Sequence, residues 1–453
     1  MASATRSRAA AAGTGSVGLV SCVAFAVGTM VGAGVFVLSG LAVERAGPAA
    51  IASFVLAGVL VLLSALSFAV VASLARPGGS GYAYVGQALG PRWGFLTSWA
   101  FWLGGVIGIA FVLNAFGSYL NQFFVSAMPA TAVAVAAVIV IALLNLGPAS
   151  LIGRAETALV VVKVSILVLL IVFAFVHLGR AQFTPFAPHG STSVISTSAL
   201  LFIAYLGFNV VTNMAGDVER PQRTIPLAIL LSMGIVALIY VGVVVALLAG
   251  QISTYDEASV GTAAKHLIGN WGGILIPIGA LLSTLSAANA NMLGSSEIMV
   301  RLAGDRQVPT VVGRLWRGHP AVSVLAAASI AVILVLIGGV QVIVALGNVA
   351  AIVAMVLVNA AAFQAQRHQH RAGIKLPAGP LLPALGLLAA LVQLFFIGWW
   401  QTLIGLALVA AGFGLYALRG HHQPGHHAVI IDHLNQNAGP AGRALRRPSA
   451  KGA

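Results

Sequence analysis

Long stretches of this sequence contain no Asp, Glu, Lys or Arg, and they limit what the chain can fold into. They cover residues 9–43, 46–75, 93–153, 181–216, 224–255, 266–296, 318–366 and 376–418. Each is long enough for one or two apolar helices of roughly 20 residues, the length that crosses a lipid bilayer. Only 7% of the residues are charged, against about 25% in soluble domains. The sequence therefore predicts an all-α polytopic membrane protein.

Turn signals divide these stretches into twelve predicted transmembrane helices. They are placed at 16–40, 47–74, 94–123, 130–147, 155–178, 194–216, 225–250, 270–300, 321–338, 341–365, 381–397 and 399–418. The runs are too long for the strands of a membrane barrel, which alternate apolar and polar residues over short segments. Two segments that are more polar than the spans, 77–94 and 253–266, are predicted to form short surface helices between them.

The basic residues predict how the spans are oriented. Of the 23 Lys and Arg residues, 19 fall on the side of the N-terminus, 3 fall on the opposite side, and Lys163 lies within a span. Basic loops face the cytoplasm in membrane proteins, so both termini are expected to be cytoplasmic in a multi-pass protein of the plasma (inner) membrane. The net charge of +14 then reflects loops that face anionic lipid, and no nucleic-acid partner is expected.

Lys163 is the charged residue predicted to lie deepest in the bilayer. Arg154 marks the start of its span, and at 1.5 Å per residue Lys163 lies about 13 Å inside. An ammonium group at such a depth costs roughly 2.5–3.5 kcal/mol, so it needs an internal partner or must release its proton. A lysine that gains and loses a proton suits a proton-coupled transporter. The alternative is a structural lysine paired with a buried acid, for which Glu156 and Glu297 are the nearest candidates.

Two predicted spans are interrupted by glycine at related places. The first contains G-T-M-V-G-A-G-V-F at 28–36, and the sixth contains A-Y-L-G-F-N at 204–209. Glycine-broken helices at corresponding positions of two halves indicate the midplane site of an inverted-repeat transporter, although glycine also allows close helix packing. The predicted organisation is a tail at 1–15, repeats at 16–178 and 194–365, two further helices at 381–418, and a disordered tail at 419–453.

Several motifs appear in the order that one transporter family shares. They are the run at 28–36, P-G-G-S-G-Y-A-Y at 77–84, W-G-F-L-T-S-W at 93–99, F-I-A-Y-L-G-F-N at 202–209, E-R-P-Q-R-T-I-P at 219–226 and L-G-S-S-E-I-M-V-R-L-A-G-D at 293–305. Together, over residues 16–418, they resemble the amino acid–polyamine–organocation (APC) superfamily. The stretch G-R-A-E-T-A-L-V-V-V-K, which ends at Lys163, is most similar to the proton-coupled amino-acid transporters within it.

The resemblance implies a five-plus-five inverted repeat (the LeuT fold), alternating access and solute uptake. It also implies where the Lys163 ammonium lies: against the backbone of the first span from Gly28 to Val31, and against the hydroxyl groups of Ser283 and Ser286. Two residues depart from the family pattern. Glu297 stands where relatives commonly carry a basic residue, which puts the cytoplasmic gate contacts in doubt.

The second departure is Asn209, which stands where many relatives carry an acid and argues against a cationic substrate. A polyamine would also need two or more carboxylates, and the predicted midplane offers none. We therefore expect a neutral or small apolar amino acid as the substrate.

The two breaks predict how an amino acid is held. Unwinding at Gly32, Ala33 and Gly34 frees backbone N–H groups at a helix N-terminus, which suit a carboxylate. Freed carbonyl groups around Gly207 and Phe208 suit an ammonium group, and irregular backbone is tolerated at this depth only where it lines a cavity. The further predicted contacts with substrate are Asn209, Tyr205, Trp102 and Asn289. Phe208, with Trp99 or Trp102, is expected to form a gate.

The leading hypothesis is a secondary transporter that imports amino acids together with protons through Lys163. The alternative is an exchanger of amino acids or amines, in which Lys163 is a fixed charge. A membrane enzyme would need a cluster of catalytic groups at one depth, which the predicted spans lack, and no cofactor or metal is expected. The expected partners are an amino acid, protons and membrane lipid, while the sequence leaves the choice between monomer and homo-oligomer open. Cys22 is the single cysteine, so no intrachain disulfide forms.

Overall fold

A computed structural model describes residues 17–74, 81–146, 152–213, 218–316, 319–367, 374–376 and 378–419. Within these ranges the regular elements are α-helices and 3₁₀-helices, and β-pairing is limited to two isolated bridges. The all-α fold class predicted from the sequence is confirmed. The tail predicted at 1–15 lies outside the described residues, and so does the tail predicted at 419–453 apart from Arg419, which ends α17 (Trp399–Arg419).

The predicted spans overlap helices of the described chain. Those that are uninterrupted are α4 (Ala50–Leu74), α6 (Pro91–Phe123), α7 (Ala130–Leu146), α8 (Ile152–Val176), α11 (Pro221–Ala249), α13 (Gly272–Gly304), α14 (Ala321–Ile337), α15 (Val340–Arg367), α16 (Leu381–Ile397) and α17 (Trp399–Arg419). Short elements between spans are α5 (Gly81–Leu89), α12 (Ser259–Ile268), η1 (Gly47–Ala49), η3 (Leu178–Arg180) and η5 (Thr310–Gly313).

The first and sixth spans are interrupted, as their glycines predict. The first consists of α2 (Leu19–Met30) and α3 (Ala33–Ala46). The sixth consists of α9 (Gly190–Leu200), the 3₁₀-helix η4 (Leu201–Tyr205) and α10 (Asn209–Asn213). A helix of 12 residues such as α2 is only about 18 Å long. Each interrupted span therefore needs all of its parts to cross a bilayer.

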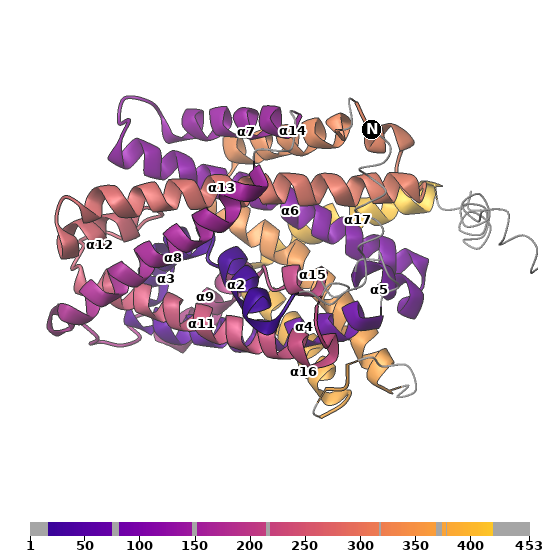
Figure 1. The fold of residues 1–453 in the computed structure, drawn as a ribbon, viewed down its shortest axis with the longest axis horizontal. Helices are drawn as coiled ribbons and strands as arrows, with labels where there is room; N and C mark the ends of the chain where they lie inside the picture. The colour runs from indigo at the N-terminus through magenta and orange to yellow at the C-terminus, as the bar shows by residue number, and fades with distance from the viewer. Residues whose placement is uncertain are drawn as a thin grey trace, which may run out of the picture.

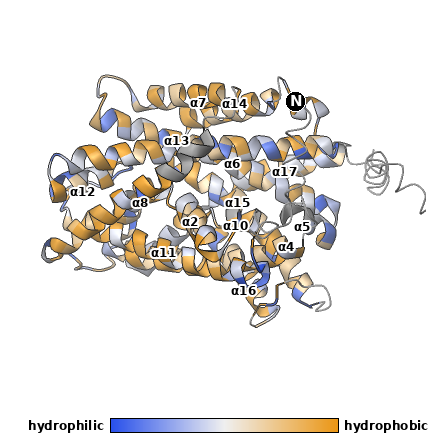
Figure 2. Cartoon of the chain, viewed as in Figure 1, coloured by the Kyte–Doolittle hydropathy of each residue, from blue (hydrophilic) through white to orange (hydrophobic). Residues whose placement is uncertain are grey.

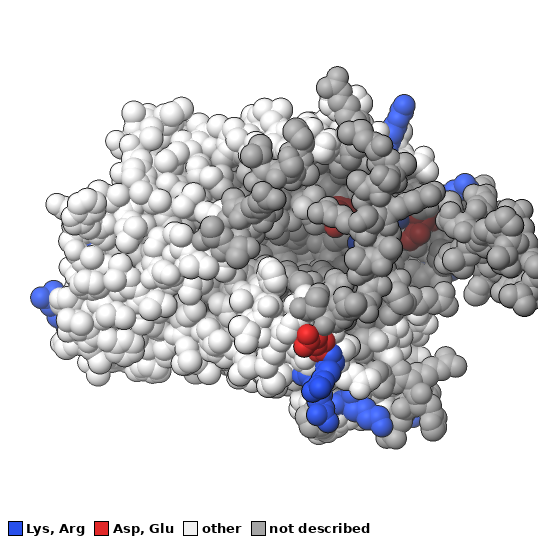
Figure 3. All heavy atoms as spheres, in the orientation of Figure 1, with Lys and Arg blue, Asp and Glu red and all other residues white. Residues whose placement is uncertain are grey.

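Hydropathy identifies the chain as a multi-pass membrane protein. Among the described residues, 7 helical runs are long and apolar enough to span a membrane by themselves, and the shorter apolar helices include α7, α14 and α16. Apolar residues cover the long helices, while polar residues gather toward the two ends of the bundle (Figure 2). On the face drawn in Figure 3, a broad uncharged band separates Lys and Arg atoms at the left edge from the charged atoms in the right-hand part.

The surface helices mark the two ends of the bundle. Figure 1 shows α12 at the left end and α5 at the right end, with α13 running across the width between them. α6 packs along α13 and α15, and α11 packs along α4, α2 and α8. The interrupted helices pack against long continuous helices, α2 mainly on α11 and α9 on α4 and α16.

The two halves of the first span are packed differently. Every residue from Ala33 to Val43 in α3 is buried, because α4, α9, α11 and α12 surround it. Near its end, Arg45 donates to Gln341 of α15, and Gln341 donates to Glu44. α2 instead leaves one face exposed, with Val20 at 82%. Helix α3 is therefore enclosed by its neighbours, at the end of the bundle where α12 lies.

Small residues allow the helices to approach closely. Gly117 of α6 lies so near the first residue of α7, Ala130, that a Cβ atom at Gly117 would collide with the Ala130 carbonyl oxygen. Backbone cannot move aside as a flexible side chain can. Close approach through small residues is the usual way in which helices associate in membranes.

We expect Gly117→Ala to lower the midpoint of thermal unfolding in detergent, because overpacking a helix contact costs about 1–3 kcal/mol. Gly234 of α11 is the matched control, since a Cβ atom there meets nothing within 4 Å. Gly234→Ala should leave the midpoint unchanged or raise it, because alanine is the better helix former. Equal midpoints for both variants would contradict the assigned α6–α7 contact.

Candidate functional site

The first break exposes the N-terminus of α3 inside the bundle. The amide of Val31 donates to Val27 O at 2.8 Å and ends α2, and Gly32 precedes the first residue of α3, Ala33. No side chain caps this helix start. The first N–H groups of a helix have no partner within it, and they carry the positive end of its dipole. The Gly32 N–H donates to Met30 O at 2.7 Å, so the N–H groups of Ala33 and Gly34 at the start of α3 are the ones suited to bind an anion such as a carboxylate.

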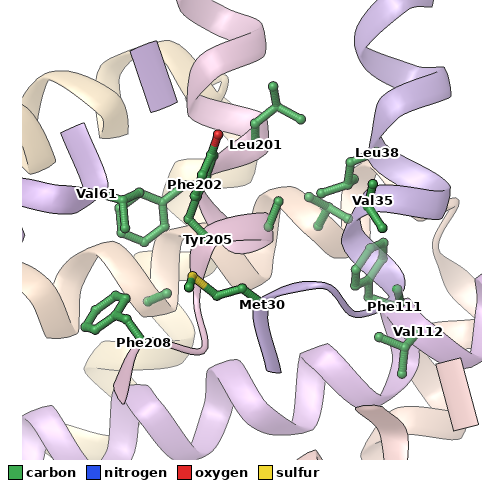
Figure 4. Packing of buried hydrophobic residues seen from close by; sticks show 14 of the residues in the cluster. Met30, Val35, Leu38, Val61, Phe111, Val112, Leu201, Phe202, Tyr205 and Phe208 are labelled. Carbon is green, nitrogen blue, oxygen red and sulfur yellow. The ribbon is translucent and has the colours of Figure 1, made fainter. Parts of the chain in front are cut away.

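The second break faces the first. After η4 the chain turns through Leu206, Gly207 and Phe208, and Gly207 has a φ of +139°. A Cβ atom at Gly207 would lie 3.0 Å from both Cγ and the backbone N of Met30, the last residue of α2. Figure 4 shows the Met30 side chain extending toward Tyr205 and Phe208. Glycine is required here because other residues disfavour this φ and because the two backbones approach so closely.

Tyr240 of α11 joins the two breaks. Its hydroxyl oxygen lies 2.8 Å from Met30 O and 2.7 Å from Ala204 O, and its single proton is shared between these two carbonyl groups. The side chain is fully buried. A buried carbonyl without a hydrogen bond is costly, above all in a membrane. One hydroxyl group therefore stabilises carbonyls from both interrupted helices and holds the breaks side by side.

Aromatic rings line one side of this region. The Phe208 ring packs edge-on against Phe68 of α4 at a centroid distance of 6.0 Å, and Phe68 meets Phe101 of α6 at 6.1 Å. The neighbour of Phe208 in this structure is Phe68, and the gate of Phe208 with Trp99 or Trp102 stays a prediction. The Trp99 indole donates to Leu408 O of α17 at 3.2 Å, which directs that ring toward α17.

Lys163 lies between two helix contacts of α8. One turn before it, Val160 packs against Gly28 of α2, where a Cβ atom would lie 2.5 Å from Val160 Cγ1. One turn after it, Ile166 packs against Gly279 of α13, where a Cβ atom would lie 3.1 Å from Ile166 Cδ1. Lys163 is only 4% exposed. The lysine is therefore buried on the part of α8 that contacts both the broken first span and α13.

The other residues predicted for proton coupling lie on the helices that α8 contacts. Ser283 is one turn along α13 from Gly279 and is buried, with no hydrogen bond to its Oγ among the described residues. Ser286 is also buried on α13, and Val31 is buried at the end of α2. Lys163 is the one charged side chain among the buried residues of the described chain. Glu297 is exposed on α13, and the Glu156 side chain lies outside the described part.

The remaining residues predicted to contact substrate differ in their hydrogen-bond partners. Tyr205 donates to Phe54 O of α4 at 2.9 Å, so its hydroxyl serves a helix contact. Asn289 accepts a hydrogen bond from Asn145 of α7 at 2.8 Å. Trp102 is buried beside Trp99, with no described partner for its indole N–H, and Asn209 begins α10. Among the residues described, no three His, Cys, Asp or Glu side chains form a group that could hold a metal ion.

Sequence reasoning missed Tyr240, Phe68 and Asn145. Tyr240 stands in the middle of an otherwise apolar span, and a deep polar aromatic residue is a signal that its hydroxyl has a partner. Phe68 carries no such signal, since it is one apolar residue among many in α4. The role of Asn145 depends on which face of α13 meets α7, and that face is visible only in the folded bundle.

A bundle of membrane-length helices that encloses two facing, interrupted helices is the architecture of a membrane transporter rather than an enzyme. Residues 22–417 match the model of the amino acid permease family, so the chain belongs to that family, within the APC superfamily that the motifs indicate. Its members are transporters. Amino acid transport across a membrane is accordingly the function of this chain.

Curated relatives of the chain are named as transporters or permeases. The chain is 30% identical to the inner membrane transport protein YbaT of Escherichia coli, over 67% of this chain and 73% of the relative. It is 27% identical to the branched-chain amino acid permease BcaP of Bacillus subtilis, over 86% of this chain and 90% of the relative. The methylthioribose transporter of Bacillus subtilis is also 27% identical, over 65% of this chain and 68% of the relative.

We expect Tyr240→Phe to weaken substrate binding more than it weakens the fold. Losing one buried hydrogen bond costs about 0.5–1.5 kcal/mol, and here both breaks lose their shared donor. Tyr119→Phe is the matched control, because the Tyr119 hydroxyl is also buried and donates at 2.8 Å to Phe36 O, within α3 and away from the breaks. Thermal unfolding should shift similarly in both variants, while the substrate Kd rises only in Tyr240→Phe. A rise in both would argue for a general effect on the bundle.

Proposed function

We propose that this permease imports neutral amino acids together with protons, and that the substrate is held between the two breaks. The observation that supports this placement is the approach of Gly207 to Met30, because Gly207 lies in the turn between η4 and α10 and Met30 lies just before the N-terminus of α3. The carboxylate would accept from the N–H groups of Ala33 and Gly34, because the Gly32 N–H already donates to Met30 O. The ammonium group would donate to carbonyl groups of the turn at Leu206–Phe208.

The proposed substrate class follows from charge and from the rings near the breaks. No acid is buried among the described residues, so a cationic side chain would have no partner at this depth. Met30, Phe208 and Phe68 offer apolar surface instead, which favours a neutral, apolar side chain. The relationship to a branched-chain amino acid permease points in the same direction.

The proposed coupling step uses the position of Lys163. With its proton bound, the ammonium would join α8 to the first span near Gly28–Val31 and to Ser283 and Ser286 of α13. Without the proton the attraction is lost, and α2 would be free to move away from α8. α2 is the half of the first span that keeps an exposed face. Proton binding and release would thereby alternate access between the two sides of the membrane.

The proposed organisation places the protein in the plasma membrane with both termini in the cytoplasm, so that α5 lies inside and α12 outside. The first repeat would run from α2 to α8 and the second from α9 to α15, with α16 and α17 added. In each repeat the first helix is interrupted and the fifth is continuous. This correspondence supports a pseudo-twofold relation between the halves.

Uptake into proteoliposomes tests the coupling. We expect an inward proton gradient to drive accumulation of L-leucine, L-isoleucine or L-alanine by the wild-type protein, and Lys163→Gln to abolish the response to the gradient while the protein stays folded. Gradient-independent flux that requires internal amino acid would instead identify an exchanger, with Lys163 as a fixed charge. Wild-type pH dependence in Lys163→Gln would refute the coupling role.

Glu257 supplies the control for this experiment. It precedes α12, outside the spans, and burial, with Asp256 and Glu44 nearby, raises the pKa of its carboxyl group. Because its folded pKa is raised, Glu257 takes up a proton at a higher pH than an ordinary carboxyl group does and would add a pH response of its own. We expect Glu257→Gln to keep gradient-driven uptake, which assigns the coupling to Lys163.

Substitution of Gly207 tests the placement of the substrate. Gly207→Ala should abolish amino acid binding, because alanine disfavours a φ of +139° and its Cβ atom would meet Met30 at 3.0 Å. Gly190→Ala is the matched control, since Gly190 also has a positive φ, +79°, with nothing within 4 Å. Calorimetric titration of both purified variants separates backbone strain from loss of the site. Retained affinity in Gly207→Ala would show that the turn only packs helices.

A further inference from the structure

A buried asparagine of α15 holds the second interrupted helix. Asn348 has no exposed surface, and its side-chain Nδ2 donates to two backbone oxygens of α9, Ala199 O at 3.0 Å and Leu200 O at 2.8 Å. These are the last two residues of α9 before η4 begins. A side chain from a distant part of the sequence thus bonds the point at which the sixth span changes its helix type.

Donors from outside the helix stabilise this position. The last carbonyl groups of an α-helix have no partner within that helix, and the tighter 3₁₀-helix that follows has poorer hydrogen-bond geometry. A buried carbonyl that lacks a strong bond costs free energy, and in a bilayer no water replaces it. An amide NH₂ group carries two N–H bonds, so one Asn348 side chain provides a donor for each carbonyl.

The residue beside Asn348 meets the same region. A Cβ atom at Gly347 would lie 3.3 Å from Cδ1 of Ile203, in the middle of η4, and 3.2 Å from Cγ2 of Ile107 in α6. α15 therefore contacts η4 through Gly347 and bonds the end of α9 through Asn348. Both contacts act on the segment that leads to Gly207. The position of that turn relative to α3 depends on them.

We infer that Asn348 is a positioning residue that fixes η4, so that the turn at Gly207 presents its carbonyl groups to the substrate ammonium. The inference rests on the proposed function, since it takes the substrate to lie between the breaks. Asn348 lies on the fifth helix of the second repeat, as Lys163 lies on the fifth helix of the first. The amide of Asn348 does not titrate, whereas the amine of Lys163 does. The hydrogen bonds from Asn348 to the sixth span are therefore independent of pH, whereas the proposed attraction of Lys163 for the first span depends on its proton.

The same helix supplies a matched control. Asn359 of α15 is also fully buried, and its Nδ2 donates to Ser64 Oγ of α4 at 2.9 Å. In both asparagines the Oδ1 atom lacks a hydrogen bond among the described residues. Asn359 bonds a continuous helix and not an interrupted one. Truncation of either side chain removes one buried amide from α15, but only Asn348 bonds the sixth span.

The experiment compares Asn348→Ala with Asn359→Ala in the purified full-length protein. L-leucine, L-isoleucine and L-alanine are each titrated into wild type, and the one that binds most tightly is used throughout. We expect similar drops in thermal stability for the two variants, but at least a tenfold rise in Kd only in Asn348→Ala. Hydrogen exchange of residues 201–208 should also quicken only in Asn348→Ala. Wild-type Kd and exchange in Asn348→Ala would overturn the inference.

Three further variants keep the result decisive. If Asn348→Ala does not fold, Asn348→Ser and Asn359→Ser take the place of the alanine pair under the same criteria, because serine retains one O–H donor. Gly207→Ala is titrated in parallel. If Gly207→Ala binds like wild type, the proposed substrate site is wrong, and the hydrogen exchange of 201–208 still decides whether Asn348 fixes η4. If Gly207→Ala loses binding while Asn348→Ala keeps it, only the role of Asn348 fails.

Discussion

The hydrogen bond from Tyr240 to the carbonyl groups of Met30 and Ala204 is the contact on which the centre of this permease depends. An interrupted helix frees backbone groups that a bilayer cannot hydrate, and two interruptions double that cost. Sharing one hydroxyl group between them is possible only if the breaks lie side by side. The hydrogen bonds that stabilise the freed carbonyl groups therefore also fix the distance between the two breaks. This distance sets the space between α3 and the turn at Gly207.

Continuous helices support this centre from both sides. α8 packs on the first span where Val160 meets Gly28, and α15 packs on the sixth span where Gly347 meets Ile203. Each supporting helix carries a buried polar side chain at this level, Lys163 on α8 and Asn348 on α15. Glycine on one partner and a branched side chain on the other bring the helices close enough for such polar groups to matter.

The sequence allowed the spans and both breaks to be predicted, because apolar length and glycine position are local properties. It did not allow the partners across helices to be predicted. The hydrogen bond that Asn289 accepts from Asn145 was not predicted, since the position of Asn289 in α13 does not reveal which neighbour its face meets. Phe68 and Asn348 went unnoticed for the same reason: their importance comes from residues more than 100 positions away in the chain.

The unequal packing of the first span has a mechanical consequence. α3 is enclosed by neighbours along its whole inner length, whereas α2 has a bare side. Displacing α3 would open contacts with α4, α9, α11 and α12 at once, while tilting α2 would open contacts on one side of that helix, mainly with α11. The neighbours of the first span therefore constrain its N-terminal half less than its C-terminal half.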